Sequence, residues 1–142
     1  MALVWLYNHT MKTLSVVGAI FIHNGCIFAA RRGESRYAYV AHRYEFVGGK
    51  QEAGESLADA LRRELREEMA LDAEVVAPYM SVHHDYPDFS IDLHTFLCRM
   101  RGDYRLLEHE SAAWLPVATL DPAEWAPADA PVVIRIKKEF AL

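Results

Sequence analysis

The stretch from residue 48 to residue 71, GGKQEAGESLADALRRELREEMAL, constrains the fold more than any other part of the sequence. Its glycines predict a loop, and Ser56 with Asp59 three residues later matches the capping box that opens many helices. At about 100° per residue, the apolar side chains of the following segment share one stripe. They are Leu57, Leu61, Leu65 and Met69. The stretch therefore predicts a loop and then an amphipathic helix that packs on another part of the chain.

Segments on both sides of this helix predict β-strands. Residues 13–22, TLSVVGAIFI, and the run CIFAARR are separated by Asn24-Gly25, the strongest short signal for a hairpin. The other expected strands are 45–47, 73–84, 89–98 and 112–117. Residues 131–141 carry apolar side chains at helical spacing, whereas the proline-rich segment 121–131 should be irregular. Two helices among so many strands predict an α+β fold with helices packed on a mixed sheet.

Length and composition predict one domain. The chain has 142 residues, and we expect a single domain over 13–142, with residues 1–12 as an N-terminal extension or with an alternative start at Met11. No apolar run reaches the roughly 18 residues that span a bilayer, and the first residues do not resemble a signal peptide. Cys26 and Cys98 lack metal-ligand spacing, which is typical of buried thiols in a reducing compartment. The sequence thus predicts a cytoplasmic protein without a membrane partner.

The formal net charge of −5 argues against binding of duplex nucleic acid, which requires a basic face. It leaves room for a small anionic ligand if a cation is held locally. Glu64, Glu67 and Glu68 crowd together beside the apolar stripe of the helix, and like charges at this spacing repel by a few tenths of a kcal/mol per pair. A solvated acidic edge balanced by neighbouring arginines is the ordinary explanation. Their place beside the buried stripe favours a divalent cation instead, since Mg²⁺ pairs one or two carboxylates with substrate phosphates.

The same stretch resembles the Nudix box. In words, the box is Gly, five residues, Glu, seven residues, Arg-Glu, an aliphatic residue, any residue, Glu-Glu, any residue, Gly and an aliphatic residue. The positions in register are Gly49, Glu55, Arg63-Glu64, Leu65, Glu67-Glu68 and Leu71. Ala70 departs from the pattern, because the family has glycine there. That glycine suits a left-handed helix cap, so alanine should cost about 1 kcal/mol or shift the cap, and we expect the helix ending rather than the ligands to differ.

The resemblance implies an α/β/α sandwich and hydrolysis of a nucleoside diphosphate linked to another group. It implies that Glu64, Glu67 and Glu68, with the carbonyl of Gly49, bind Mg²⁺ or Mn²⁺. Arg63 would pair with Glu55 and hold the loop against the helix. Glu108 resembles a loop acid that the family uses for metal binding or as a base, with Glu110 as the alternative. Which carboxylate acts as the general base, and how many metal ions bind, stay open.

The likeness extends to the MutT-type nucleoside triphosphate pyrophosphohydrolases and the CTP pyrophosphohydrolases, through RYEFVGGKQEAGES, HESAAWLP and APADAPVV. It implies that Arg32 and Lys50 meet phosphates. Asp129 is a candidate N-cap of the last helix and a candidate base contact. An ionised Asp129 would only accept hydrogen bonds, which favours cytosine or oxidised guanine nucleotides over UTP. Tyr37 and Tyr39 could stack on the base or simply pack in the protein.

The leading interpretation is a Mg²⁺-dependent nucleoside triphosphate pyrophosphohydrolase that releases a monophosphate and pyrophosphate and cleans the nucleotide pool. One alternative keeps the fold but takes dinucleoside polyphosphates, ADP-ribose or a nucleotide sugar. Another is a non-catalytic module that recognises a damaged base or a protein, although such a module would not need the acids of the box. The sequence is compatible with a monomer or a homodimer.

Overall fold

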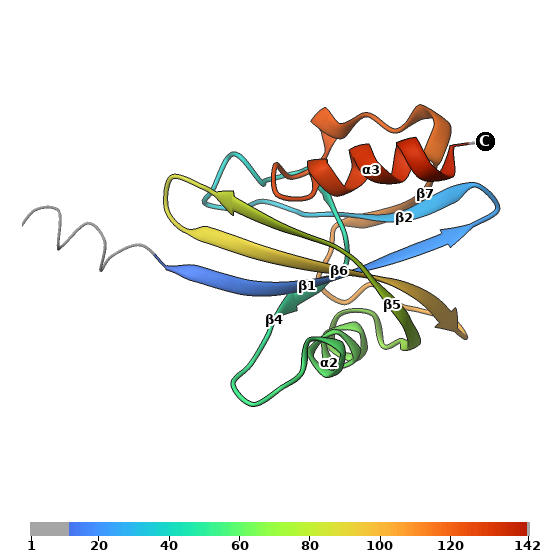
Figure 1. Cartoon of the computed structure of the whole chain (residues 1–142), viewed down its shortest axis with the longest axis horizontal. Helices are drawn as coiled ribbons and strands as arrows, with labels where there is room; N and C mark the ends of the chain where they lie inside the picture. Colours follow the sequence, from blue (N-terminus) through green and yellow to red (C-terminus); the bar gives the residue numbers. More distant parts are fainter. Residues whose placement is uncertain (1–11, 142) are drawn as a thin grey trace, which may run out of the picture.

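The computed structural model describes residues 12–141. The extension predicted for residues 1–12 lies outside the described residues except for Lys12, and the first strand begins at Thr13. A twisted sheet lies between two helices, α2 (Leu57–Met69) and α3 (Ala130–Phe140), which cover opposite sides of it (Figure 1). This arrangement confirms the predicted α/β/α sandwich. No helix within residues 12–141 has the length and apolar character needed to cross a lipid bilayer.

Strand β1 organises the sheet. The strands of the described part are β1 (Thr13–His23), β2 (Cys26–Arg31), β3 (Tyr44–Glu45), β4 (Gly48–Lys50), β5 (Asp72–Asp85), β6 (Ser90–Arg101) and β7 (Ser111–Pro116). Their main order is β3-β2-β1-β6-β5, while β4 pairs with β1 and β7 pairs with β2. The pairing of β1 with β6 is parallel and the other strand pairs are antiparallel, so the sheet is mixed as predicted. The Asn24-Gly25 turn joins β1 to β2 with positive φ angles of 50° and 73°, which confirms the hairpin.

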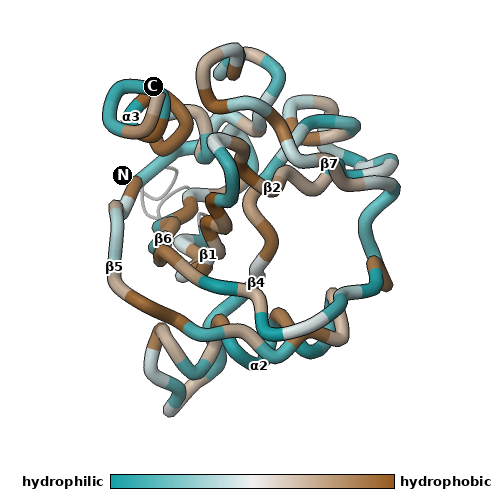
Figure 2. The backbone as a smooth tube through the Cα atoms, turned by 90° about the vertical axis from the view of Figure 1, so that its right-hand side faces the viewer, coloured by the Kyte–Doolittle hydropathy of each residue, from teal (hydrophilic) through white to brown (hydrophobic). Residues whose placement is uncertain are grey.

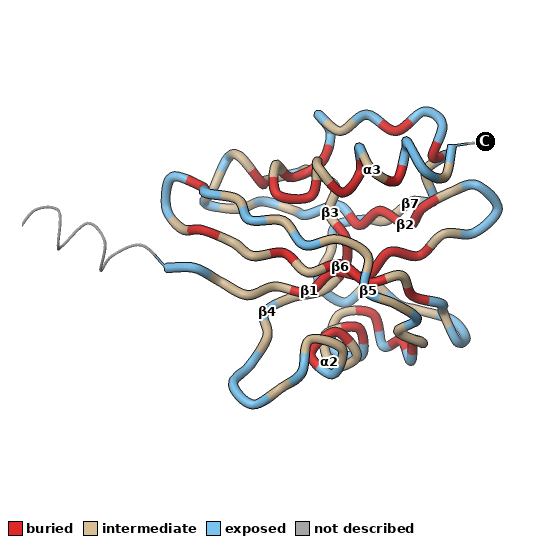
Figure 3. Tube along the Cα trace, viewed as in Figure 1, coloured by how far each residue is buried: buried red, intermediate tan, exposed pale blue. Residues whose placement is uncertain are grey.

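Side chains of β1 alternate between two cores. Val17, Ala19 and Phe21 are buried with the apolar stripe of α2, whereas Ile20 is buried with the inner face of α3. The α3 side also holds Trp125, which is 1% exposed. Apolar segments of β1 and β6 run through the centre of the molecule (Figure 2), and the buried face of each helix is turned toward them (Figure 3). The period of two in the strand and the apolar stripes of the helices thus build two separate hydrophobic layers.

Two predicted segments differ from the structure. The strand expected at 45–47 is interrupted between β3 and β4, because the backbone N–H of Phe46 donates to Oδ1 of Asp129 (3.1 Å) instead of to a neighbouring strand. The segment expected to be irregular, 121–131, contains a short 3₁₀ helix, η2 (Pro122–Glu124). Its first turn is stabilised by the carboxylate of Asp121, which accepts from the N–H of Ala123 (3.0 Å).

Helix α2 begins as predicted and ends without a shift. The hydroxyl of Ser56 accepts from the N–H of Asp59 (3.1 Å), but the carboxylate of Asp59 pairs with Arg62 (2.8 Å), so only half of the capping box forms. Ala70 adopts the left-handed conformation, with φ 49° and ψ 35°, and its N–H donates to the carbonyl of Arg66 (3.0 Å). The expectation of a different helix ending is therefore wrong. Ala70 adopts the left-handed backbone geometry that suits glycine at this position. The alanine therefore strains the backbone of the cap instead of moving the end of the helix.

Candidate active site

A cleft of about 1000 Å³ opens between α2, β4 and the segment before α3. Most of the predicted site residues line it: Arg32, Gly49, Lys50, Arg63, Glu64, Glu67, Glu68 and Asp129. Its wall also includes the aromatic side chains of Tyr37, Tyr86 and Phe89. Loop, helix and sheet residues that are far apart in the sequence therefore meet in one concave surface, with acidic groups from α2 and a buried carboxyl from the start of α3.

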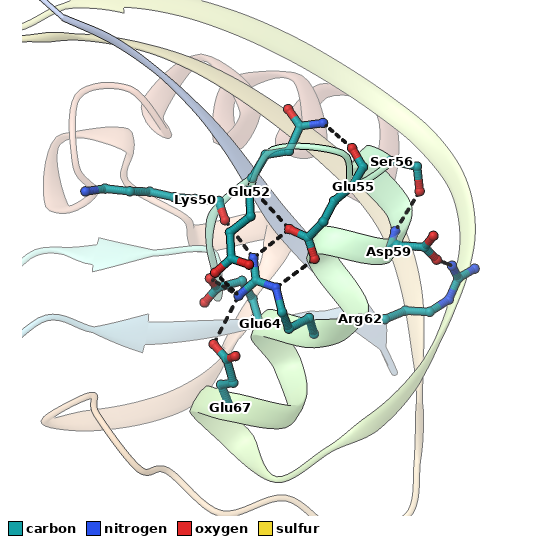
Figure 4. Close-up of polar contacts among 10 residues, drawn as sticks. Lys50, Glu52, Glu55, Ser56, Asp59, Arg62, Glu64 and Glu67 are labelled. Carbon is teal, nitrogen blue, oxygen red and sulfur yellow. Dashed lines mark hydrogen bonds and ion pairs between the residues drawn. The ribbon is translucent and has the colours of Figure 1, made fainter.

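Arg63 is the centre of the polar network between the glycine loop and α2, and Figure 4 labels four of its partners, Lys50, Glu55, Glu64 and Glu67. Its Nε donates to one oxygen of Glu55 (2.7 Å) and its Nη2 donates to the other (2.9 Å) and to the carbonyl of Lys50 (2.9 Å). Its Nη1 donates to Glu64 (2.9 Å) and Glu67 (3.1 Å). The hydrogen bond from Arg63 lowers the pKa of Glu55. The predicted contact between Arg63 and Glu55 is thus present, and it holds the loop against the helix.

Gly48 and Gly49 allow the loop to approach the sheet and the acids. A Cβ atom on Gly48 would lie 1.8 Å from the carbonyl oxygen of Val17, so no side chain fits there. A Cβ atom on Gly49 would lie 2.4 Å from the carboxyl group of Glu64. The backbone of Gly49 therefore lies directly against a predicted metal ligand, Glu64.

Glu64 and Glu68, on the cleft side of α2, lie in an environment that opposes their ionisation. Burial, together with the nearby carboxylates of Glu64 and Glu108, raises the pKa of Glu68 to about 8 against the opposing effect of His109. Burial also raises the pKa of Glu64, against the opposing effect of Arg63. Oε2 of Glu68 is buried and has no hydrogen-bond partner among the described residues. Clustered carboxylates in this state need a proton or a cation.

His109 and Glu45 belong to this site, and the sequence analysis missed both. Nε2 of His109 lies 2.9 Å from Oε1 of Glu45, and the side chain of His109 is only 7% exposed. Burial opposes ionisation of Glu45, but the hydrogen bond from His109 and the charge of Arg32 lower its pKa. One signal was present, because an acid between Tyr44 and Phe46 in an otherwise apolar strand needs a buried partner. His109 gave no such signal, since it lies in a polar loop.

The predicted cationic residues differ in how they are paired. Arg32 lines the cleft, but its guanidinium pairs with both oxygens of Glu45 (3.3 and 3.2 Å), so part of its charge is already compensated. Lys50 also lines the cleft, is exposed and forms no ion pair with a described residue. Of the two candidate loop acids, Glu108 is close enough to raise the pKa of Glu64, whereas Glu110 pairs with His42 at 3.5 Å.

Asp129 corrects one expectation, its capping role. Its side chain makes no capping hydrogen bond to α3, because Oδ1 is used by the N–H of Phe46. It is 7% exposed, and burial together with the charge of Glu45 raises its pKa to about 8. This shift favours the protonated form of the buried carboxyl, which donates as well as accepts. The base contact expected for an ionised Asp129 therefore depends on which form the carboxyl takes, and it stays a prediction.

An aromatic cluster forms one wall of the cleft. Tyr39 stacks on Tyr86 with ring centroids 4.7 Å apart and on Tyr37 at 5.5 Å. Its hydroxyl donates to Asp88 (2.7 Å). Tyr37 and Phe89 line the cleft, whereas Tyr39 is not part of its lining. Packing therefore accounts for Tyr39, while the ring of Tyr37 can meet a ligand.

The donor set at this site fits a divalent cation. Carboxylates and a backbone carbonyl are the oxygen ligands that Mg²⁺ and Mn²⁺ prefer, and Oε2 of Glu68 is a buried oxygen without a partner. Within residues 12–141, no three acidic, histidine or cysteine side chains are already arranged to hold a metal ion. The reason is visible at Arg63, whose Nη1 lies between Glu64 and Glu67 and hydrogen-bonds both. A cation would share these carboxylates with Arg63.

Comparison with known proteins agrees with this geometry. The NUDIX domain profile matches residues 12–136. The 8-oxo-dGTP diphosphatase of Escherichia coli is 32% identical, with 90% of this chain and 99% of the relative covered. The CTP pyrophosphohydrolase of the same organism is 34% identical, with 87% and 90% covered. The solution structure of MutT from methicillin-resistant Staphylococcus aureus is 39% identical, has a TM-score of 0.71, and covers 91% of this chain and 98% of its own. The chain belongs to the Nudix family of hydrolases.

Proposed function

We propose that the protein is a divalent-metal-dependent nucleoside triphosphate pyrophosphohydrolase that acts in nucleotide-pool cleaning. The observation that carries this proposal is the continuity of the cleft, which joins the acids of α2 to the buried carboxyl of Asp129. The names of the two Escherichia coli relatives support the substrate class. One nucleotide can then place its phosphates at the acids and its base beside Asp129.

The reaction adds water across a phosphoric anhydride bond. The water oxygen bonds to one phosphorus, the bridging oxygen leaves with the other, and the products are a monophosphate and pyrophosphate. A cation held by Glu64, Glu67, Glu68 and the carbonyl of Gly49 would neutralise phosphate oxygens and lower the pKa of a bound water. Lys50, an exposed cation in the lining of the cleft, would meet the phosphates.

Glu64 is suited to accept the proton of the attacking water, because burial raises its pKa toward the range of a useful base. Glu108 is the alternative acceptor. A comparison of Glu64→Gln with Glu108→Gln separates these roles. Because Glu64 is also a predicted ligand, Glu64→Gln should raise the metal concentration needed for half-maximal rate in either case. If Glu64 is the base, its kcat at saturating metal should fall much further than that of Glu108→Gln, and if Glu108 is the base the order should reverse.

Asp129 sets the base preference. In its protonated form it can donate to a base carbonyl, and in its ionised form it accepts from an amino or N–H group. We therefore propose cytosine or oxidised guanine nucleotides as substrates, with discrimination against UTP that grows as the pH rises through about 8 and the carboxyl ionises. Asp129→Asn should reorder the nucleotides and remove this pH dependence. An unchanged ranking would contradict a base contact.

A product assay tests the reaction. The protein is incubated with Mg²⁺ and a panel that contains CTP, dCTP, UTP, 8-oxo-dGTP, ADP-ribose and a dinucleoside tetraphosphate, and the products are separated by ion exchange. Monophosphate and pyrophosphate from a triphosphate support the proposal. Preferential cleavage of ADP-ribose or the dinucleoside tetraphosphate would show that the substrates are other nucleoside diphosphate derivatives. Tight binding without turnover would indicate a non-catalytic module.

A further inference from the structure

A row of charged and polar side chains, largely buried except at Arg32, connects the loop before β7 with α2. Nε2 of His109 donates to Oε1 of Glu45 (2.9 Å), since an ionised carboxylate can only accept, and Glu45 in turn pairs with Arg32 (3.2 Å). The other ring nitrogen of His109, Nδ1, faces Oε2 of Glu68 at 3.9 Å. The side chains of His109 and Glu68 are 7% and 14% exposed. His109 thus lies between a fixed carboxylate and a predicted metal ligand.

The two atoms that face each other are the unpaired ones. Among the described residues, Oε2 of Glu68 and Nδ1 of His109 are the buried side-chain N and O atoms that have no hydrogen-bond partner. Buried polar groups are nearly always paired in folded proteins, so two adjacent exceptions in one cleft point to a function. A distance of 3.9 Å is too long for a hydrogen bond and short enough to close by a small movement of the Glu68 side chain.

Main-chain hydrogen bonds hold the loop that carries His109 against α2. The N–H of Leu107 donates to the carbonyl of Glu68 (2.9 Å), and the N–H of Arg105 donates to the carbonyl of Met69 (2.8 Å). These bonds hold the loop to the last turn of α2. The loop position is therefore fixed by main-chain contacts, which leaves the imidazole available for a role beyond holding the loop.

We propose that His109 is a positioning residue for Glu68: as an imidazolium it donates from Nε2 to Glu45 and from Nδ1 to Oε2 of Glu68, so that the other carboxylate oxygen is presented to the cation in the cleft. The inference rests on the proposed metal site. Carboxylates that bind metals are usually oriented by such outer partners, and their loss weakens metal binding by about 10-fold to 100-fold. His109 is itself oriented by Glu45, which gives the imidazole one fixed direction.

The test measures Mn²⁺ binding to the full chain without nucleotide, by the electron paramagnetic resonance signal of free Mn²⁺. In His109→Gln, the amide can reach Glu45 as Nε2 does, but Glu68 loses its partner. In His109→Asn, the amide keeps the place of Nδ1 opposite Glu68. The matched control is His83→Gln, because His83 also lies between two carboxylates, Asp85 (2.9 Å) and Asp92 (2.6 Å), outside the lining of the cleft.

We expect His109→Gln to weaken Mn²⁺ binding by about 10-fold or more, His109→Asn to weaken it much less, and the control to leave it unchanged. Equal affinity of His109→Gln and wild type overturns the inference. Equal losses in the two His109 variants, matched by equal falls in Tm, also overturn it in favour of a purely structural role. If the wild-type protein itself binds no Mn²⁺, the proposed metal site is wrong, and the proposed role of His109 is then wrong as well.

A second readout needs no substitution. In the ¹⁵N NMR spectrum of wild type, Mg²⁺ should move the Nδ1 resonance of His109 more than its Nε2 resonance, because only Nδ1 faces Glu68. A shift confined to Nε2, or none at saturating Mg²⁺, contradicts the proposal even if the variants fail to fold.

Discussion

Glu67 and Glu68 belong to the same predicted ligand set but have different surroundings. Glu67 is 55% exposed and bonded to Arg63, whereas Glu68 is buried beside His109. Replacement of either by glutamine keeps the volume and removes a ligand charge, so we expect kcat to fall by at least about 100-fold, which corresponds to about 3 kcal/mol of transition-state stabilisation. Pyrophosphate release measures the rate and circular dichroism checks the fold.

Glu74→Gln is the matched control for both variants, because Glu74 is an acid of β5 that pairs with Arg99 (3.6 Å) away from the cleft. Its rate should equal that of wild type. Near-normal rates in both Glu67→Gln and Glu68→Gln would remove these residues from the metal site.

The buried carboxyl of Asp129 gives a prediction about pH and stability. Its folded-state pKa of about 8 lies above the ordinary value of 3.8, so the folded protein holds a proton that the unfolded chain has released. This contribution favours folding at low pH and is lost as the pH rises from about 4 through about 8. Asp129→Asn lacks the titration, and its Tm relative to wild type should therefore increase between pH 5 and pH 9. Thermal unfolding at several pH values measures the difference, and Asp103→Asn, which replaces an exposed acid, is the control variant.

The C-terminal cap of α2 carries a removable strain. Ala70 has φ 49°, a conformation that glycine adopts without a Cβ clash. We expect Ala70→Gly to stabilise the protein by roughly 0.5–1 kcal/mol, since relief of the strain exceeds the added entropy of the unfolded chain. Ala58→Gly, inside the same helix, should destabilise it by a similar amount. Urea unfolding distinguishes the two, and a loss of stability in Ala70→Gly would mean that the cap is not strained.

Elements with local signals were predictable, and those set by distant contacts were not. The stripe of α2 and the Asn24-Gly25 turn depend on neighbouring residues, so their positions follow from the sequence. The interruption between β3 and β4 depends on Asp129, which is 83 residues away from Phe46. The same contact removed the capping role that local chemistry had favoured for Asp129. The buried hydrogen bond between Phe46 and Asp129 thus outweighs two local preferences: the strand preference at Phe46 and the capping preference at Asp129.

Binding of a cation should change the stability of the whole molecule. The acids on the cleft side of α2 repel one another, and a ligand that binds only the folded state stabilises it in proportion to RT ln(1 + [L]/Kd). We expect Mn²⁺ to raise Tm, and to raise it more at pH 8.5 than at pH 6, because Glu68 must lose its proton to bind. The same titration with Glu68→Gln should show a much smaller rise. An equal rise in this variant would indicate that the metal binds elsewhere.

The sequence predicted which residues belong to the candidate site better than it predicted which of them contact one another. The spacing of the box gave Glu55, Arg63 and Glu64, and the structure brings these three into contact. The row through Glu45 and His109 joins residues 64 positions apart, and no local pattern encodes that pairing. The pKa shift of each carboxyl could not be predicted from the sequence either, because it depends on burial that only the folded chain defines.

Strand β1 has one further consequence, for the tolerance of the gene to insertions and deletions. Neighbouring side chains of β1 serve opposite layers, with Ala19 turned toward α2 and Ile20 toward α3. Loss of a single codon in this strand would exchange the two sets, and both helices would lose their packing partners in one step. Point substitutions between apolar residues leave that assignment intact. The strand can therefore diverge in composition, but its length is fixed.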